Sequence, residues 1–386
     1  MRFSIVIPTR NRAPLLAHAI RSALAQTLED YELVISNNCS TDETESVVKR
    51  FGDPRIAYFR TEEALSMVDH WEFALGKVRG DWVLYLCDDD ALLPDCLSFL
   101  DRMAQQDQDI SIIQYANSIY VYDDGITDAG NYLRLKKRSR DLFEIKDSAS
   151  QLRTVFRTTS GDMPKFLNSA VRMDLVEDIR QHRGRIFYNW VPDYSSGVLL
   201  LAHTQRHMVL HEPLMLWGCN VRSYGSGARV DPDHLMNFLR EFDQFDGRFP
   251  WSPYPDIIVI ANMVHDTLCA MRQELGVTQG QLPIDPLRFR RALISDLRIY
   301  LEKGHDRFAR PLAVVERDLR RMIPGPTRAY KAIRKKMSSG WRRLSGGFRR
   351  RREESRIIRG RGTGTRFENI SEAADFLWKQ GRGRRV

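Results

Sequence analysis

Residues 82–90 read WVLYLCDDD, a short apolar run that ends in three consecutive aspartates. The apolar part predicts a buried β-strand, because it is continuous, brief and contains β-branched and aromatic residues. Adjacent carboxylates repel one another, so three of them at the end of a buried strand indicate a bound Mg²⁺ or Mn²⁺ ion. The alternatives are a solvated acidic loop and a helix N-terminus that is stabilised by negative charge.

Further strands and helices alternate on both sides of this stretch. Residues 2–8, 31–36, 55–60 and 110–115 read as strands, and residues 14–28 carry an apolar helical face between the first two. Nearly continuous apolar strands that are separated by helices predict a parallel sheet covered on both faces. The expected fold class is therefore α/β, with a mostly parallel sheet flanked by helices.

Polar clusters follow three of these strands. They are Thr9–Arg12 (TRNR), Asn37-Asn38 and Asp88–Asp90. Ligands of open α/β sheets bind beyond the carboxyl ends of the strands. We therefore expect the three clusters to converge on one crevice.

The composition indicates a folded protein of a reducing compartment. The chain has 386 residues, 42% of them hydrophobic, which suffices for one large domain with an appendage or for two domains. Its five cysteines are scattered, so neither a disulfide framework nor a zinc cage is expected. The first residues have no signal-peptide pattern, and no apolar stretch is long enough to span a bilayer. These features predict a cytoplasmic location.

The positive charge of the chain is concentrated near its C-terminal end. Residues 317–366 contain 18 Lys and Arg and three acidic residues, whereas the first 316 residues are mildly acidic. Trp341, Leu344 and Phe348 lie between the basic residues, which favours a peripheral segment on an anionic membrane surface. A solvated tail is the main alternative. A nucleic-acid arm is disfavoured because no recognised reading module accompanies the segment.

Three motifs in this order resemble the family 2 glycosyltransferases, which have the GT-A fold. They are SIVIPTRNR (residues 4–12), ISNNCSTDET (residues 35–44) and RGDWVLYLCDDDALLP (residues 79–94). The resemblance covers residues 1–115 well and continues more loosely to about residue 225. It implies an inverting, metal-dependent enzyme of polysaccharide biosynthesis that uses Mn²⁺ or Mg²⁺. Such an enzyme moves a sugar from a nucleotide-diphosphate donor to a saccharide or lipid-linked saccharide acceptor.

The resemblance also implies roles for single residues. The expected nucleotide-binding residues are Pro8, Thr9, Asn11, Asn38, Asp42, Asp88 and Asp89, and the expected metal ligands are Asp88 and Asp90. Asn37-Asn38 replaces the more common Asp-Asp pair of the family, which leaves the identity of the base open. Turn formation is the alternative role for Asn11 and Asn38.

An inverting transfer needs a general base that takes the proton of the acceptor hydroxyl. The family keeps an aspartate for this task in the second half of the domain, and Asp193 in NWVPDYSSGVLLLA is the best match. A plain helix cap is the alternative for Asp193, and Asp162 and Glu212 are competing bases. As further candidates for contacts with the diphosphate or the acceptor we name Trp190, His211 and Arg222.

The expected organisation has four parts. Residues 1–115 form the nucleotide-sugar half and residues 116–230 the acceptor half of the GT-A domain. A helical extension follows at 231–316, and a basic, partly helical tail at 317–386. Two other functions stay open: a nucleotidyltransferase, although the loop after the first strand lacks its glycines, and a non-catalytic nucleotide-sugar-binding or scaffold protein.

Overall fold

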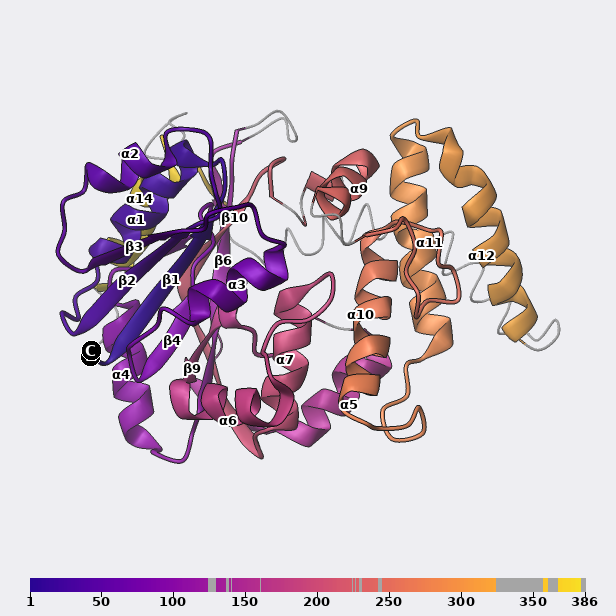
Figure 1. The fold of residues 1–386 in the computed structure, drawn as a ribbon, viewed down its shortest axis with the longest axis horizontal. Helices are drawn as coiled ribbons and strands as arrows, with labels where there is room; N and C mark the ends of the chain where they lie inside the picture. Colours follow the sequence, from indigo (N-terminus) through magenta and orange to yellow (C-terminus); the bar gives the residue numbers. More distant parts are fainter. Residues whose placement is uncertain are drawn as a thin grey trace.

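The computed structural model describes most of the chain. The described residues are 1–123, 130–136, 139, 141–159, 161–223, 225, 227–228, 231–241, 245–323, 357–359 and 367–382. Within them, the strands form one 11-stranded sheet with helices on both faces (Figure 1). The α/β fold class, the flanking helices and the helical C-terminal region are confirmed.

Four parallel strands form the N-terminal half of the sheet, in the order β3-β2-β1-β4. Their bounds are Phe3–Thr9 (β1), Tyr31–Asn37 (β2), Ile56–Arg60 (β3) and Trp82–Tyr85 (β4). The register pairs Thr9 with Asn37, so the polar clusters that follow β1 and β2 leave the sheet at the same edge. Two of the three clusters that were expected to converge therefore lie side by side.

The other half of the sheet is mixed. β9 (Ser169–Arg172) lies antiparallel between β4 and β6 (Ile112–Val121), and β10 (Arg206–Cys219) runs parallel to β6. Antiparallel pairs complete the sheet, namely β10 with β5 (Ala91–Leu92) and β8 (Phe143–Asp147), and β7 (Tyr132–Arg134) with β6 and β11 (Ile357–Arg359). The expected parallel pairing is thus found in the N-terminal half of the sheet, whereas most pairs of this second half are antiparallel.

Successive residues of a strand point to opposite faces of the sheet. Because the buried strands are apolar on both faces, helices cover both. Ile5 and Ile7 of β1 pack with α1 (Ala13–Leu24) and α4 (Cys96–Gln106). The other face packs with the helices α3 (Met67–Leu75), α5 (Ser148–Thr158), α6 (Met173–Arg183) and α7 (Pro192–Ala202). The short helix α2 (Thr44–Lys49) follows β2.

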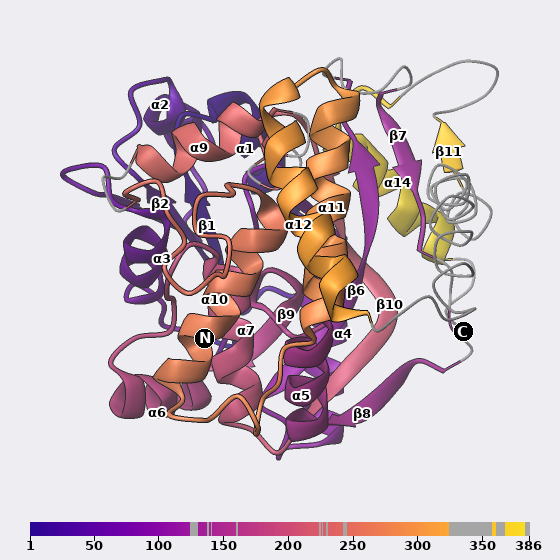
Figure 2. The same ribbon diagram turned by 90° about the vertical axis from the view of Figure 1, so that its right-hand side faces the viewer.

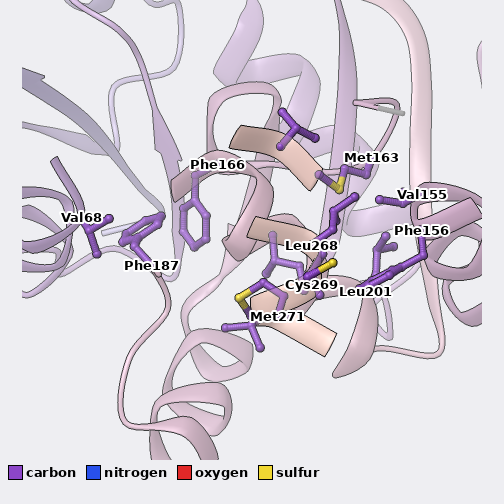
Figure 3. Packing of buried hydrophobic residues seen from close by; sticks show 14 of the residues in the cluster. Val68, Val155, Phe156, Met163, Phe166, Phe187, Leu201, Leu268, Cys269 and Met271 are labelled. Atoms are coloured by element: carbon purple, nitrogen blue, oxygen red, sulfur yellow. The ribbon is translucent and has the colours of Figure 1, made fainter. Parts of the chain in front are cut away.

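The helical extension shares the core of that second face. It comprises α9 (Pro232–Arg240), α10 (Ile260–Glu274), α11 (Pro286–Glu302) and α12 (Ala309–Met322), with a 3₁₀ turn at Asp306–Phe308 (η2). Another 3₁₀ turn, Phe166–Asn168 (η1), precedes β9. Figure 3 shows Leu268, Cys269 and Met271 of α10 in the same cluster as Leu201 of α7. Phe166 and Phe187 pack edge to face in this cluster, with ring centroids 5.2 Å apart. The expected boundary at residue 316 falls inside α12, and the four-part division stays a prediction.

The last described helix returns to the N-terminal domain. α14 (Ile370–Arg382) packs against α1, β5 and β10, and Ser371 Oγ lies 3.2 Å from His18 Nδ1 of α1. Figure 2 shows α14 and β11 on the side of β7, away from α12. The residues of this small cluster are Ala91, Leu93, Tyr120, Leu133, Leu216, Phe367, Ile370, Ala373 and Ala374. The described helix α14 is therefore a part of the domain.

Most of the basic segment lies outside the described residues, including Trp341, Leu344 and Phe348. The membrane-surface reading of this segment therefore stays a prediction. Within the described ranges, none of the helices has both the length and the apolar character that a membrane span needs.

Candidate active site

Asp88 anchors the turn that follows β4. Its Oδ2 accepts a hydrogen bond from Thr9 Oγ1 at 2.8 Å, and its Oδ1 accepts one from Arg12 Nη1 at 2.8 Å. Arg12 also lies 3.5 Å from Asp89 Oδ2 and donates to the carbonyl of Arg222. One guanidinium therefore joins the loop after β1, the aspartate turn and the segment after β10.

Asp89 and Asp90 are held by the end of β10. Asn220 Nδ2 donates to Asp89 Oδ2 at 2.8 Å, and Ser223 Oγ donates to the same oxygen. The backbone N–H of Gly218 donates to Asp90 Oδ1 at 2.7 Å. A Cβ atom at position 218 would lie 1.9 Å from the carbonyl oxygen of Asp89, so this close approach of the strand to the turn requires glycine.

The carboxylates of this turn are electrostatically strained. Asp88, Asp89 and Asp90 are at most 5% exposed. Burial raises the pKa of Asp88, which Arg12 opposes, and burial together with Asp89 raises the pKa of Asp90 far above its ordinary value. Burial opposes the charge of Arg12, but Asp88 and Asp89 outweigh it and raise the pKa of the guanidinium. One guanidinium faces three carboxyl groups, so the turn favours a further cation.

The donor set of the turn fits a hard divalent cation. Among the described residues, ligand atoms of Cys87, Asp89 and Asp90 lie within 4.8 Å of one another. Carboxylate oxygens suit Mn²⁺ and Mg²⁺, whereas burial raises the pKa of the Cys87 thiol and keeps it a weak ligand. This group places Asp89 beside Asp90, and both oxygens of Asp88 accept hydrogen bonds from Thr9 and Arg12. The expected metal role of Asp88 and Asp90 stays a prediction.

The polar residues after β1 and β2 fix the loops around the site. Asn11 has a φ of 53°, and its Oδ1 accepts a hydrogen bond from the backbone N–H of Thr41 at 2.8 Å. The Asn38 amide exchanges two hydrogen bonds with the backbone of Leu65, each 2.8 Å long. Asp42 accepts from Ala13 N and Thr44 N at the starts of α1 and α2, and these bonds lower its pKa although burial opposes the shift. Their expected contacts with a nucleotide stay predictions.

A cavity of about 610 Å³ joins these parts. Its lining includes, from the N-terminal half of the sheet, Pro8, Thr9, Asn11, Asn38, Asp88 and Asp89. From the rest of the chain it includes Lys165, Asp193, Tyr194, Trp217, Arg222, Phe238, Ile260, Met263 and Val264. Asp42 and Asp90 are not among the lining residues, so Asp90 lies behind the surface of the turn. The N-terminal half, the middle of the chain and the helical extension all contribute to this one cavity.

Asp193 shares the cavity with Asp88 and Asp89. It lies in the first turn of α7 and pairs with Lys165, whose Nζ is 2.7 Å from Asp193 Oδ2. Burial opposes the charge of Lys165, but Asp193 and then Tyr194 raise the pKa of the ammonium, which lies 3.9 Å from the Tyr194 ring centroid. No hydrogen bond from the described residues reaches Asp193 Oδ1. That oxygen is therefore available to a ligand.

The other candidates have different positions. Arg222 lines the cavity, whereas Trp190, His211, Asp162 and Glu212 are not among its lining residues. Trp190 Nε1 donates to Asp266 Oδ2 at 3.0 Å, and His211 Nε2 lies 3.7 Å from Glu144 Oε1. Of the three aspartate and glutamate residues considered as bases, Asp193 is the one that faces the cavity.

Sequence reasoning did not assign roles to four residues of the site. Arg12 belongs to the quoted TRNR cluster, and Lys165 begins the stretch that precedes β9, but neither has a local signal for its ion pair. Tyr194 and Trp217 are aromatic residues of α7 and β10 that line the cavity. These four residues are far apart in the sequence, and only the fold brings them to the cavity.

The chain has an α/β fold with a cavity beyond the strand ends, and parts of it are similar to known proteins. Residues 4–160 match the family model "Glycosyl transferase family 2". The GalNAc(5)-diNAcBac-PP-undecaprenol beta-1,3-glucosyltransferase of Campylobacter jejuni is 35% identical over 108 residues, which are 27% of this chain and 35% of that protein. The succinoglycan biosynthesis protein ExoO of Rhizobium meliloti is 32% identical over 94 residues, 24% of this chain and 27% of that protein.

The solved structure of S. aureus TarS 1-349 in complex with UDP-GlcNAc is also similar. Its sequence identity is 14% and its TM-score 0.48, over 78% of this chain and 81% of that chain. The chain spans about a third of the first of these curated relatives and about a quarter of the second. The family match supports the expected glycosyltransferase class and disfavours the nucleotidyltransferase alternative.

Proposed function

We propose that this chain is an inverting glycosyltransferase that moves a sugar from a nucleotide-diphosphate donor to a hydroxyl group of a saccharide acceptor. The observation that carries the proposal is the single cavity that brings the buried aspartate turn together with Asp193. The family match of residues 4–160 supports sugar transfer as the reaction.

Different residues of the site would bind the diphosphate, hold the metal and position the aspartates. Arg222 lines the cavity, and its guanidinium has no ion pair with a described residue, so it can contact the diphosphate. Asp89 and Asp90 would hold Mn²⁺ or Mg²⁺, which would neutralise the charge that develops on the leaving diphosphate. Arg12 keeps Asp88 in place. The turn and the two arginines therefore form the donor side of the site.

Asp193 supplies the base in this mechanism. The acceptor oxygen forms a bond to the anomeric carbon of the donor while the bond to the diphosphate breaks, and Asp193 Oδ1 takes the proton of the acceptor. Lys165 holds the other carboxylate oxygen at 2.7 Å and so fixes the direction of Oδ1. The aspartate needs this support because it lies on the first turn of α7, where the side chain could also turn back to cap the helix.

Nucleoside diphosphates should stabilise the protein in the presence of metal. A ligand at a hundred times its Kd adds about 2.7 kcal/mol to the free energy of unfolding, which corresponds to a rise of roughly 3 °C in the melting temperature. Thermal unfolding with UDP, GDP and other nucleoside diphosphates, each with Mn²⁺, Mg²⁺ or EDTA, measures this effect. The same panel identifies the base. Absence of any metal-dependent rise would contradict the proposal.

We further propose that the acceptor is lipid-linked and that the basic segment docks on an anionic membrane surface. The name of the Campylobacter jejuni relative describes an acceptor on PP-undecaprenol, and residues 317–366 carry a net charge of +15. Near an anionic leaflet each Lys or Arg contributes about 1 kcal/mol. Such a segment would bring the cavity to acceptors that are held in the bilayer.

Full-length protein should therefore sediment with anionic liposomes at low salt. Replacement of Arg349–Arg352 by serine should lower the partitioning by on the order of 100-fold or more, since four charges are removed. Vesicles of phosphatidylcholine alone serve as the control, and nucleotide binding should not change. Truncation after Ile323 is a poor test, because it also removes α14 and uncovers its apolar cluster. Wild-type protein that stays in the supernatant would leave the solvated tail as the explanation.

A further inference from the structure

Trp217 is an exposed aromatic residue in the wall of the cavity. Six large apolar side chains of the described residues are exposed: Met1, Leu142, Ile145, Trp217, Trp251 and Met322. Of these six, Trp217 is the one that lines the cavity, and 54% of its surface is open to solvent. A large apolar surface at a ligand cavity is an expected place for a ligand contact.

The neighbours of Trp217 fix its position on β10. Leu216 is buried in the cluster beneath α14, and Gly218 is bonded to Asp90 through its backbone N–H. Trp217 pairs in register with Ile119 of the parallel strand β6. Side chains alternate along a strand. Leu216 and Gly218 face inward, so Trp217 between them faces outward, next to the glycine that contacts the aspartate turn. The backbone at Trp217 is therefore held in place by the sheet.

We propose that Trp217 is the platform on which a pyranose ring of the acceptor stacks, an inference that rests on the proposed function. One face of a pyranose presents C–H groups, and an indole ring offers a flat apolar surface with a negative π face. The hydroxyl groups at the edge of the sugar stay free to be hydrogen-bonded or to react. The chemical class of the acceptor at this subsite is thus a saccharide with an accessible C–H face.

The exposure of the ring assigns it to the acceptor rather than to the donor sugar. The donor sugar is attached to the diphosphate, so its anomeric carbon has to lie in the interior, between the aspartate turn and Asp193. Trp217 lines the cavity and is half open to solvent, so we place its ring where the cavity meets the solvent. An acceptor that enters from the solvent passes this ring first. We therefore assign the ring to the acceptor.

Saturation-transfer NMR on the full-length protein tests this subsite. The probes are methyl β-D-glucopyranoside, methyl β-D-galactopyranoside and methyl α-D-mannopyranoside, each with the stabilising nucleoside diphosphate and Mn²⁺. At least one probe should receive saturation mainly on the protons of one ring face. Trp217→Ala should weaken its binding about tenfold, as expected for the loss of an aromatic contact, whereas Trp217→Phe should keep it within a few-fold.

Trp251→Ala is the matched control. Trp251 is 46% exposed, is absent from the cavity wall and engages Asp266 through its backbone N–H, so its loss should leave the pyranoside signals unchanged. If no probe gives a signal, or if Trp217→Ala does not change the signals, the inference is overturned. The proposed function would still hold in that case if nucleoside diphosphates stabilise the protein. A Trp217→Ala protein that loses liposome sedimentation and keeps the saccharide signals would also overturn it. If nucleoside diphosphates do not stabilise the wild-type protein, the proposed function itself is contradicted.

Discussion

Replacement of Asp90 by asparagine should abolish metal-dependent nucleotide binding and leave the fold intact. The amide oxygen of asparagine can still accept the hydrogen bond from Gly218 N, which is 2.7 Å long in the parent. The negative charge that would hold the cation is lost. The loss of a direct ligand should exceed the roughly 10- to 100-fold weakening that is typical of outer-shell partners. Isothermal titration with the stabilising nucleoside diphosphate, with and without Mn²⁺, measures the change.

The stability of the same variant gives an independent check. Burial raises the pKa of Asp90, and a carboxyl group with a raised pKa in the folded state costs stability as the pH rises above the unfolded value. Without metal, Asp90→Asn should therefore melt no lower than the parent at pH 7, and the difference should shrink towards pH 4.

The control for Asp90→Asn is Asp81→Asn. Asp81 precedes the same strand β4 at its other end, and its side chain is 68% exposed. This variant should bind nucleotide as the parent does. Undiminished metal-dependent binding by Asp90→Asn would contradict the assignment of the aspartate turn.

Replacement of Asp193 by asparagine should lower the transfer rate by on the order of 10² to 10⁴. The change keeps the size of the side chain and removes its basicity. A base takes its proton only in the transition state, so nucleotide affinity should stay within a few-fold of the parent. Steady-state transfer to the acceptor and calorimetric binding of the nucleotide are measured on the same preparation.

The ion pair with Lys165 makes a second variant necessary. Asp193→Asn leaves the ammonium of Lys165 without its counter-ion, which could lower stability. The double variant Asp193→Asn/Lys165→Met removes both charges and should regain stability but not activity. Asp162→Asn and Glu212→Gln are the controls, because neither residue lines the cavity. Full activity in Asp193→Asn would show that the proton goes elsewhere.

The sequence predicted the N-terminal half of the fold well, and the reason is physical. A strand buried on both faces must be apolar throughout, so β1, β2 and β4 stand out as runs that end at polar residues. The carboxyl ends of parallel strands share one edge of the sheet, which is why Thr9 meets Asp88 although 79 residues separate them. Local pattern and topology together sufficed for the aspartate turn.

The contacts that complete the site could not be predicted in this way. Lys165 and Asp193 are 28 residues apart and lie on different elements, so no period or spacing in the sequence marks their pair. Ile260, Met263 and Val264 look like the apolar face of any amphipathic helix until α10 is placed against α7. For Asn38 the sequence indicated a contact with the nucleotide base, because an amide can both donate and accept hydrogen bonds. In the structure, the Asn38 amide is hydrogen-bonded to the backbone of Leu65.

The return of α14 to the N-terminal domain has a consequence for the order of synthesis. The contact between Ser371 and His18 spans 353 residues, so a ribosome releases α1, β5 and β10 long before the helix that covers them. Domains fold from the N-terminal end as they emerge, and Ala91, Leu93 and Leu216 stay uncovered until residues 367–382 have been made. During translation the segments on both sides of the aspartate turn therefore present an apolar surface, and a nascent chain at that stage is a natural client for a chaperone.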